Sequence, residues 1–598
     1  MPIDVFTIPP ILIVLAALIV LAVRPRLIHP VGALATGLAF AYAVFVPDGY
    51  ELATTAFGQF DIVLVSVDPF SRLMGLIFGF IGLVAVVYSW STDADPIQTG
   101  YALAYVGSSF GAVFAGDWLT LVFCWELMAV TSTLLVWHYG GAAIRAGFRY
   151  AVFHGIGGSV LIAAVIWHYA TADSFLITGA GIEGEVAMIL AALGIGVNVA
   201  FVGFHAWLPD TYPRPHVAAS VFLCVYTTKT GVYALYRAFP DGHLWIAYMG
   251  GAMAVFGVTF ALFQNDMRRL LSYHIQSQVG YMVAGVGIGT ELAAAGAFAH
   301  VFNHILYKGL LFMTVGVVIY RTGAESLKKI HGMRHAMPVT FVAFTIAALS
   351  IAGFPGFNGF VSKGMILYEA HHYSKYEPLW YMLLLGGVGT FMSFIKLGYY
   401  VFFYGEQTHE VERANLGQSV AMGSVALLCL GYGLYPDALV SILPFRADAA
   451  DFHVFGLTHL AEGFALAAAG LVAFALVKEP LSRIPKIPDL DLAYNPLSVG
   501  AMRGALRAVN AAIGVLDRGS SRAVLGGMRT VTAARGAAGT TAGNATGDGP
   551  SESEADSRGE PGSAVERALS VALEKRAGIG IGVFLVILAM TVVLLVSL

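Results

Sequence analysis

Residues 300–308 read HVFNHILYK and lie inside an apolar run at 292–320. In an α-helix the four-residue spacing places His300, His304 and Lys308 on one face, with successive side chains about one turn apart. The run is long enough to cross a bilayer, so this row would lie at membrane depth. A charge there costs about 2.5–3.5 kcal/mol on insertion scales, and residues that persist at that cost usually serve a function.

Two functions are open to this row from its residue types alone. Two histidines four residues apart can bind zinc, whereas histidine can also take up or release a proton near neutral pH. The motif contains neither glutamate nor cysteine, and Lys308 continues the row. We therefore favour a chain of titratable groups and expect no metal and no cofactor. Histidines that are simply satisfied structural residues are the other alternative.

The composition indicates a protein with many membrane spans. The chain has 598 residues, of which 58% are hydrophobic and 12% charged, whereas soluble domains carry about 25% charged residues. Apolar runs of membrane-spanning length predict an all-α polytopic membrane protein with about 16 transmembrane helices. The runs lie at 8–23, 30–47, 73–91, 98–115, 118–138, 149–171, 186–208, 215–238, 244–264, 272–289, 292–320, 337–373, 378–404, 416–435, 454–477 and 578–597. The three cysteines lie far apart within these runs, which argues against a disulfide, zinc or iron–sulfur framework.

Basic residues gather in the loops that follow odd-numbered spans. Because cytoplasmic loops of membrane proteins are enriched in lysine and arginine, these loops are expected in the cytoplasm and the N-terminus outside a cell membrane. The first run has no basic segment before it, so we expect a retained helix and not a cleaved signal. The loop residues are Arg24, Arg26, Arg145, Arg149, Arg268, Arg269, Arg321, Lys328, Lys329 and Arg334.

Changes of composition divide the chain into six segments. We expect N-terminal transmembrane helices at 1–97, a proton-conducting core at 98–405 and further transmembrane helices at 406–478. Residues 479–530 read as an amphipathic cytoplasmic segment, with arginines between apolar residues at helical spacing. A linker rich in small and then acidic residues, 531–576, precedes a final transmembrane helix at 577–598.

Two more ionisable residues lie in the middle of apolar runs. Glu126 occurs in LVFCWELMAV, residues 121–130, and a carboxylate in such a run must be paired, protonated or in contact with water. Lys229 lies far from the end of its run. Burial lowers the proton affinity of a lysine and a nearby carboxylate restores it, which makes Lys229 a candidate proton carrier.

Lys363 follows the sequence GFPGFNG at 353–359, which predicts an interrupted helix. Broken helices at membrane depth line cavities, and their exposed ends bind ions. Lys396 is a weaker candidate, because a lysine near the cytoplasmic end of its helix can extend its amine to the membrane surface. His274 adds a further polar group at depth.

Taken together, these motifs resemble the antiporter-like membrane subunits of respiratory complex I, membrane-bound hydrogenases and Mrp-type multisubunit cation/proton antiporters. The resemblance covers about residues 100–405. The motifs are Trp125-Glu126, FHAWLPD at 204–210, KTGVY at 229–233, RLLSYHIQSQVGY at 269–281, the row at 300–308 and AGFPGFNGFVSK at 352–363. Together they are highly specific, although no single motif would be.

The resemblance implies a fold and a set of roles. The fold is a pair of inverted five-helix bundles, each with an interrupted helix, connected by a hydrated row of charges. Residues matching Lys229, His300, His304 and Lys308 relay protons along the midplane, and the lysine matching Lys363 lies at the exit.

The same resemblance also implies a partner for Glu126. The matching glutamate pairs with a lysine on the interrupted seventh helix. This chain departs from that pattern, because the position holds Asn198. Asparagine forms hydrogen bonds but carries no charge at neutral pH. Lys229 is then the alternative partner of Glu126.

Among the subtypes, the chain is most similar to the D-type subunit of Mrp antiporters, which predicts a proton-translocating component of a sodium/proton antiporter. One alternative is a proton-pumping component of a complex I-like NADH/quinone oxidoreductase or of a membrane hydrogenase; another is the membrane component of an inorganic-carbon uptake complex. The chain has no nucleotide, flavin or cluster motif, so redox chemistry would lie in partner subunits. The expected partners are other membrane subunits, protons, sodium and the lipid bilayer, with no nucleic acid.

Overall fold

The computed structural model describes residues 5–56 and 60–483 together with positions 489, 490, 492, 496, 504 and 507. The chain divides into two units, of which the first contains the described residues from 5 to 483. All elements described below belong to the first unit. The amphipathic segment beyond residue 483, the linker and the final transmembrane helix of the sequence analysis lie outside the described residues, apart from the isolated positions.

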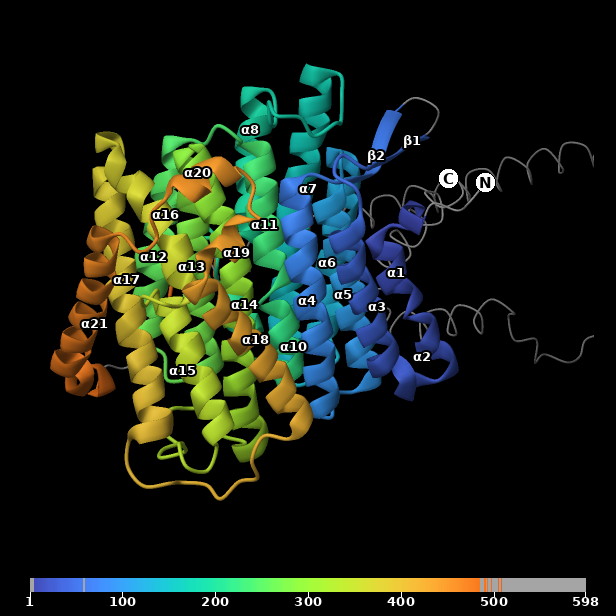
Figure 1. The fold of residues 1–598 in the computed structure, drawn as a ribbon. Helices are drawn as coiled ribbons and strands as arrows, with labels where there is room; N and C mark the ends of the chain where they lie inside the picture. Colours follow the sequence, from blue (N-terminus) through green and yellow to red (C-terminus); the bar gives the residue numbers. More distant parts are fainter. Residues whose placement is uncertain are drawn as a thin grey trace, which may run out of the picture. The chain divides into compact units, whose positions relative to one another are not determined.

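Helices build the first unit, and Figure 1 shows most of them side by side and running along a common direction. They are α1 Pro10–Ala16, α2 Ile19–Val23, α3 Ile28–Phe45, α4 Pro69–Ser91, α5 Pro96–Phe114, α6 Trp118–Trp137, α7 Ala142–Ala172, α8 Glu185–Asn198, α9 Trp207–Thr211, α10 Val217–Leu223, α11 Tyr226–Ala238, α12 Leu244–Leu262, α13 Met267–Ile288, α14 Glu291–Thr322, α15 Pro338–Ala352, α16 Asn358–His372, α17 Glu377–Gly398, α18 Leu416–Leu434, α19 Pro436–Val440, α20 Arg446–Asp451 and α21 Leu457–Arg483. Short 3-10 turns lie at Val5–Thr7, Pro25–Leu27 and Ser374–Tyr376, and a π turn follows α17 at Tyr399–Phe403.

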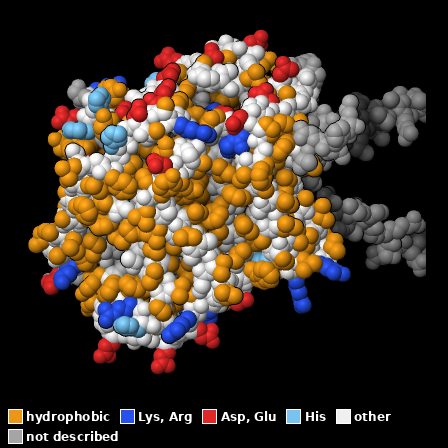
Figure 2. All heavy atoms as spheres, in the orientation of Figure 1, with side chains coloured by type: hydrophobic (Ala, Val, Ile, Leu, Met, Phe, Trp, Pro, Cys, Tyr) orange, Lys and Arg blue, Asp and Glu red, His pale blue; other side chains and the backbone are white. Residues whose placement is uncertain are grey.

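The helices confirm the predicted all-α membrane architecture. Within the described chain, nine helical stretches are long and apolar enough to cross a membrane, by length and composition. On the face drawn in Figure 2, hydrophobic side chains cover the middle, while most acidic and basic side chains lie toward the two ends. Such a distribution suits a bilayer, whose hydrocarbon core excludes charge. The count of about 16 spans stays a prediction.

A two-stranded hairpin adds to the predicted helices. Strand β1, Glu51–Ala56, pairs antiparallel with β2, Phe60–Ser66. Asp117, directly before α6, fixes the hairpin, because its Oδ2 accepts a hydrogen bond from the backbone N–H of Val63 at 2.9 Å. The same carboxylate caps α6 by accepting from the N–H of Thr120 at 2.7 Å. One side chain thus joins the hairpin to the membrane helices.

Three interruptions occur within apolar runs of the described part of the core at 98–405, besides the one that separates α1 from α2. The predicted break at 353–359 is present between α15 and α16, and Gly353 and Gly356 there adopt φ of +82° and +89°, which glycine tolerates best. A second break follows Asn198 at the end of α8, where Ala200 has φ of +61°. The third separates α10 from α11 and was not predicted.

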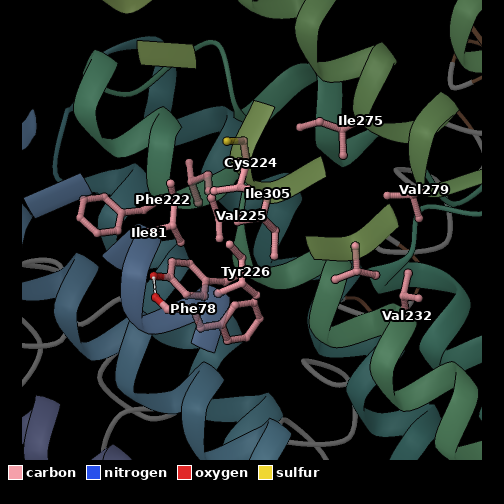
Figure 3. Packing of buried hydrophobic residues seen from close by; sticks show 14 of the residues in the cluster. Phe78, Ile81, Phe222, Cys224, Val225, Tyr226, Val232, Ile275, Val279 and Ile305 are labelled. Atoms are coloured by element: carbon pink, nitrogen blue, oxygen red, sulfur yellow. Dashed lines mark hydrogen bonds between the residues drawn. The ribbon is translucent and has the colours of Figure 1, made fainter. Parts of the chain in front are cut away.

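The break between α10 and α11 contains neither glycine nor proline, so its cause is tertiary. The freed backbone N–H of Thr227 donates to the hydroxyl of Tyr105 at 2.8 Å, and the carbonyl of Cys224 accepts from a lysine described below. Figure 3 shows the surrounding apolar packing, in which the hydroxyl of Tyr226 also donates to the carbonyl of Phe78 at 3.0 Å. Backbone groups released at depth therefore find protein partners, as a spanning segment requires.

Helix α14 occupies the interior of the first unit. In its most apolar stretch of membrane-spanning length, every residue of α14 is buried. In the corresponding stretch of α21, 17% of the residues are buried. Helices α4, α10, α13, α15, α16 and α18 contact α14. A helix that is covered on all sides has no face left for lipid, so its ionisable residues face protein and not the bilayer.

Candidate functional site

The predicted row on α14 is completely buried. His300, His304 and Lys308 have no exposed surface, and the ring centroids of the two histidines lie 6.3 Å apart. His300 has partners at both ring nitrogens: the hydroxyl of Ser362 on α16 lies 2.9 Å from Nδ1 and that of Tyr307 lies 3.2 Å from Nε2. The structure thus connects the row to the helix that carries Lys363.

Other polar atoms of the row lack protein partners. Both ring nitrogens of His304, both of His274 on α13 and the amine of Lys308 have no hydrogen bond to any described residue. The amine of Lys308 lies 5.8 Å from the ring centre of Phe394. Buried polar groups without protein partners are usually satisfied by ordered water. The arrangement is therefore suited to a hydrated path for protons.

Lys229 and Lys363 occupy equivalent positions at two helix breaks. The amine of Lys229 donates to the carbonyl of Cys224, which follows α10, at 2.5 Å. The amine of Lys363 donates to the carbonyl of Ile351 near the end of α15 at 2.7 Å. The last carbonyls of a helix have no partner within the helix, so each amine satisfies one of them. Each lysine thus follows a break and reaches back to the half-helix before it.

Glu126 lies against α7 and not against Lys229. A Cβ added to Gly158 would lie 1.5 Å from Oε1 of Glu126, so only glycine leaves room for the carboxylate. That oxygen is buried without a hydrogen-bond partner in the described chain. No ion pair joins Glu126 to Lys229 among the described residues. The alternative pairing considered from the sequence is therefore not formed.

Asn198 has a partner that the sequence analysis overlooked. Its Oδ1 lies 2.8 Å from Nδ1 of His154 on α7. His154 is buried and one turn before Gly158, and its ring lies 4.5 Å from that of Trp207. A histidine inside an apolar run is the same signal that singled out His300, so His154 could have been selected from the sequence.

Hydrogen-bonded hydroxyl groups from α5, α6 and α7 meet the start of α11, two residues before Lys229. The hydroxyl of Ser132 donates to Tyr150 at 3.0 Å, and Tyr150 lies 3.1 Å from the hydroxyl of Thr227. Thr227 also bonds Tyr105 at 2.5 Å and is next to Thr228, whose hydroxyl accepts from the amine of Lys229. Threonine and tyrosine are common in membrane helices, so no sequence signal marked these residues.

The hydrogen-bond partners of Lys396 lie outside the row. Its amine donates to the carbonyls of Leu262 and Gln264 at 2.7 and 2.8 Å. These carbonyls lie at the last residue of α12 and two residues beyond it, and a cation at a helix C-terminus satisfies such carbonyls and interacts favourably with their partial negative charge. The contacts of Lys396 are those of a helix cap.

These groups define a polytopic membrane protein with a buried row of ionisable residues and broken helices at membrane depth. Groups of three or more histidine, cysteine or acidic side chains that could hold a metal ion are absent from the described part of the chain. The chemistry open to the row is transfer of protons between nitrogen and oxygen atoms.

Comparison with known proteins gives the family. The model of the family described as "NADH:quinone oxidoreductase/Mrp antiporter, TM" matches residues 115–393. The D-type subunit of the Na(+)/H(+) antiporter of Alkalihalophilus pseudofirmus is 31% identical over 379 residues, which is 60% of this chain and 76% of that protein. The chain belongs to this family of antiporter-like membrane subunits.

Further relatives and solved structures are also similar to this chain. A probable K(+)/H(+) antiporter protein of Rhizobium meliloti, of the combined A/B type, is 28% identical over 66% of this chain, which spans only 42% of that longer relative. The Mrp complex of Dietzia sp. DQ12-45-1b contains a chain that matches with a TM-score of 0.68 at 21% identity, covering 77% of this chain and 98% of that one. A chain of respiratory complex I from Thermus thermophilus matches with a TM-score of 0.67 at 20% identity, covering 77% and 99%. Both structures share the fold.

Proposed function

We propose that this chain is the proton-translocating membrane subunit of a multisubunit sodium/proton antiporter. The observation that carries the proposal is the buried row on α14, together with two buried lysines, Lys229 and Lys363, that each follow a helix break. The relative from Alkalihalophilus pseudofirmus, named as part of a Na(+)/H(+) antiporter, supports sodium as the coupled ion. Other membrane subunits are the expected partners, since the matching structures include an Mrp complex.

Protons pass along the row by transfer between neighbouring groups and water. Lys229, Lys308 and Lys363 carry positive charge when protonated, and like charges in a poorly polarisable interior repel one another strongly. Arrival of a proton at one lysine therefore favours its release from the next. His300 and His304 on α14 provide groups that accept and donate protons between the lysines.

The membrane potential acts on each transferred charge. Moving one charge across the membrane is worth about 2.3 kcal/mol per 100 mV. In the proposed orientation the basic loops face the cytoplasm and the hairpin β1–β2 faces outside. Proton entry driven by the potential then supplies the free energy for sodium export.

A second candidate function is proton pumping for a respiratory redox complex. A membrane-bound sulfane sulfur reductase, an archaeal respiratory membrane complex, contains a chain that is 25% identical, with a TM-score of 0.67 and coverage of 82% of this chain and 86% of that one. The redox chemistry would then lie in partner subunits. Neighbouring genes for small antiporter subunits favour the first function, and genes for soluble redox subunits favour the second.

The direct test is transport by the complete complex in sealed vesicles. Lys308→Ala and Lys363→Ala are each expected to abolish proton-coupled sodium transport, because each removes a carrier from the proposed proton path. Lys329→Ala, an exposed loop substitution, is the control and should transport normally. Full activity of either variant would reject the proposed function.

A further inference from the structure

A small cavity lies beside the break between α15 and α16. Its volume is about 20 Å³, and its lining includes Lys363, Tyr281, His459 and Glu462. A cavity that leaves roughly 10–15 Å³ for the centre of a water-sized sphere is sufficient for one water molecule. The cavity thus brings a cation and a carboxylate from two different helices to one site that can hold water.

Glu462 is a half-buried carboxylate that lines this cavity. Its Oε1 is buried without a hydrogen-bond partner among the described residues. It lies in the second turn of α21, an apolar helix that begins at Leu457. A carboxylate at membrane depth is costly, and here the amine of Lys363, 4.8 Å from the ring centre of Tyr281, lines the same cavity.

Other residues of α21 already attach this helix to the break. The ring of His459 stacks on Phe360 with centroids 3.8 Å apart and planes 5° from parallel. A Cβ on Gly463 would lie 2.8 Å from Phe360 and 3.0 Å from Pro355, so the helix approaches closely at that point. Neither contact needs a carboxylate at position 462. Packing therefore does not account for Glu462.

We propose that Glu462 exchanges protons with Lys363 through a water molecule in this cavity, which makes α21 part of the proton path. The ammonium of Lys363 gives a proton to the water, and the water gives one of its protons to the carboxylate of Glu462. A charged pair becomes a neutral amine and a carboxylic acid, with no atom or charge left over. This inference rests on the proposed function, which makes Lys363 a proton carrier.

Two kinds of variant test the exchange in the full complex. Glu462→Gln removes the proton acceptor, and Glu462→Asp keeps it on a shorter stem. Gly387→Ala fills the cavity without changing a charge: its Cβ would meet Leu466 at 3.5 Å and the hydroxyl of Tyr281 at 3.6 Å, which are ordinary contacts with two lining residues. Controls are Glu479→Gln on the exposed part of α21 and Gly423→Ala, where a Cβ meets nothing within 4 Å.

The measurements are proton-coupled transport in vesicles and infrared spectroscopy of the protonated-carboxyl band. Glu462→Gln should lower transport by about 100-fold, the scale of losing a positioned proton donor or acceptor. Glu462→Asp should retain part of the activity, Gly387→Ala should slow transport, and both controls should match the parent. A carboxyl band that changes when protons are supplied to the parent complex should be missing in Glu462→Gln.

Separate results would overturn the inference and the proposed function. Normal transport by Glu462→Gln, with Lys363→Ala inactive, rejects the exchange and leaves the proposed function standing. Loss of transport in Glu462→Gln with an unchanged carboxyl band also rejects it, since the role is then structural. If Glu462→Gln does not assemble, normal transport by Gly387→Ala rejects a water-filled path. Full transport by Lys363→Ala rejects the proposed function itself.

Discussion

At the scale of single residues, two residues of the same type at membrane depth have different surroundings. Lys363 and Lys396 are both buried lysines that donate to helix carbonyls, but Lys363 lines a cavity with a carboxylate and Lys396 donates to two carbonyls at the end of α12. Their residue type alone could not separate them. The two lysines differ in the helices that supply the oxygen atoms near their amines.

Lys396→Met should therefore act on stability and not on the proton path. The apolar stem is kept, and two carbonyls lose a charged donor, so we expect a loss of about 1–3 kcal/mol in the free energy of unfolding. Thermal unfolding in detergent measures this loss. Transport per folded complex should stay near the parent value, and its complete loss in well-folded Lys396→Met would place Lys396 in the proton path.

Asn198 and His154 form a buried hydrogen-bonded pair whose contribution to stability can be measured. Asn198→Ala leaves Nδ1 of buried His154 without its hydrogen-bond partner, which should cost about 1–3 kcal/mol. Asn198→Asp keeps an oxygen at the same position and serves as the matched comparison. Equal unfolding temperatures for Asn198→Ala and the parent would show that the hydrogen bond contributes nothing.

At the scale of elements, the hairpin and α6 depend on one carboxylate. Asp117 satisfies the N–H groups of Val63 and Thr120, which belong to β2 and to the first turn of α6. Hydrogen bonds of this kind replace the partners that the ends of strands and helices lack. The local sequence specifies the helix cap, and only the fold brings the strand to it.

Asp117→Ala should loosen the hairpin first. Loss of a helix N-cap costs about 0.5–2 kcal/mol, and the N–H of Val63 also loses its acceptor. Hydrogen exchange should become faster at the amides of Val63 and Thr120, with helices far from the hairpin unchanged. Unaltered exchange at Val63 would contradict the anchoring role of this carboxylate.

At the scale of the whole molecule, the basic loops and the acidic hairpin region predict opposite sides of the membrane. The three cysteines are all buried, so thiol reagents that do not cross membranes should leave the parent protein unlabelled. The loop between α17 and α18 and strand β2 offer exposed positions, Glu410 and Asp61. These two sites can report the orientation.

Two variants, each with one added cysteine, test this orientation in intact cells and inverted vesicles. Glu410→Cys should react only from the cytoplasmic side and Asp61→Cys only from outside, because the positive-inside rule places their loops there. The parent protein is the control for background labelling. Labelling of both positions from one side would show that the spans are miscounted or the orientation is wrong.

Sequence alone determined the features that depend on local composition and helical spacing. The comparisons confirm the membrane architecture and the family, and the antiporter function stays a proposal. The geometry agrees with burial of the row at 300–308 and with the break at 353–359. Apolar length selects membrane spans, and a four-residue repeat fixes one helix face, wherever the helix lies. The roles of the individual row residues stay predictions.

Only the tertiary structure decided which distant residues meet. In the tertiary structure Asn198 contacts His154, the helix is interrupted between α10 and α11, and Lys396 donates to a carbonyl at the end of α12. The tertiary structure also brought Glu462 to the cavity of Lys363. Each of these contacts joins segments far apart along the chain. A buried polar group needs a partner, but its own sequence neighbourhood does not specify which helix will supply one.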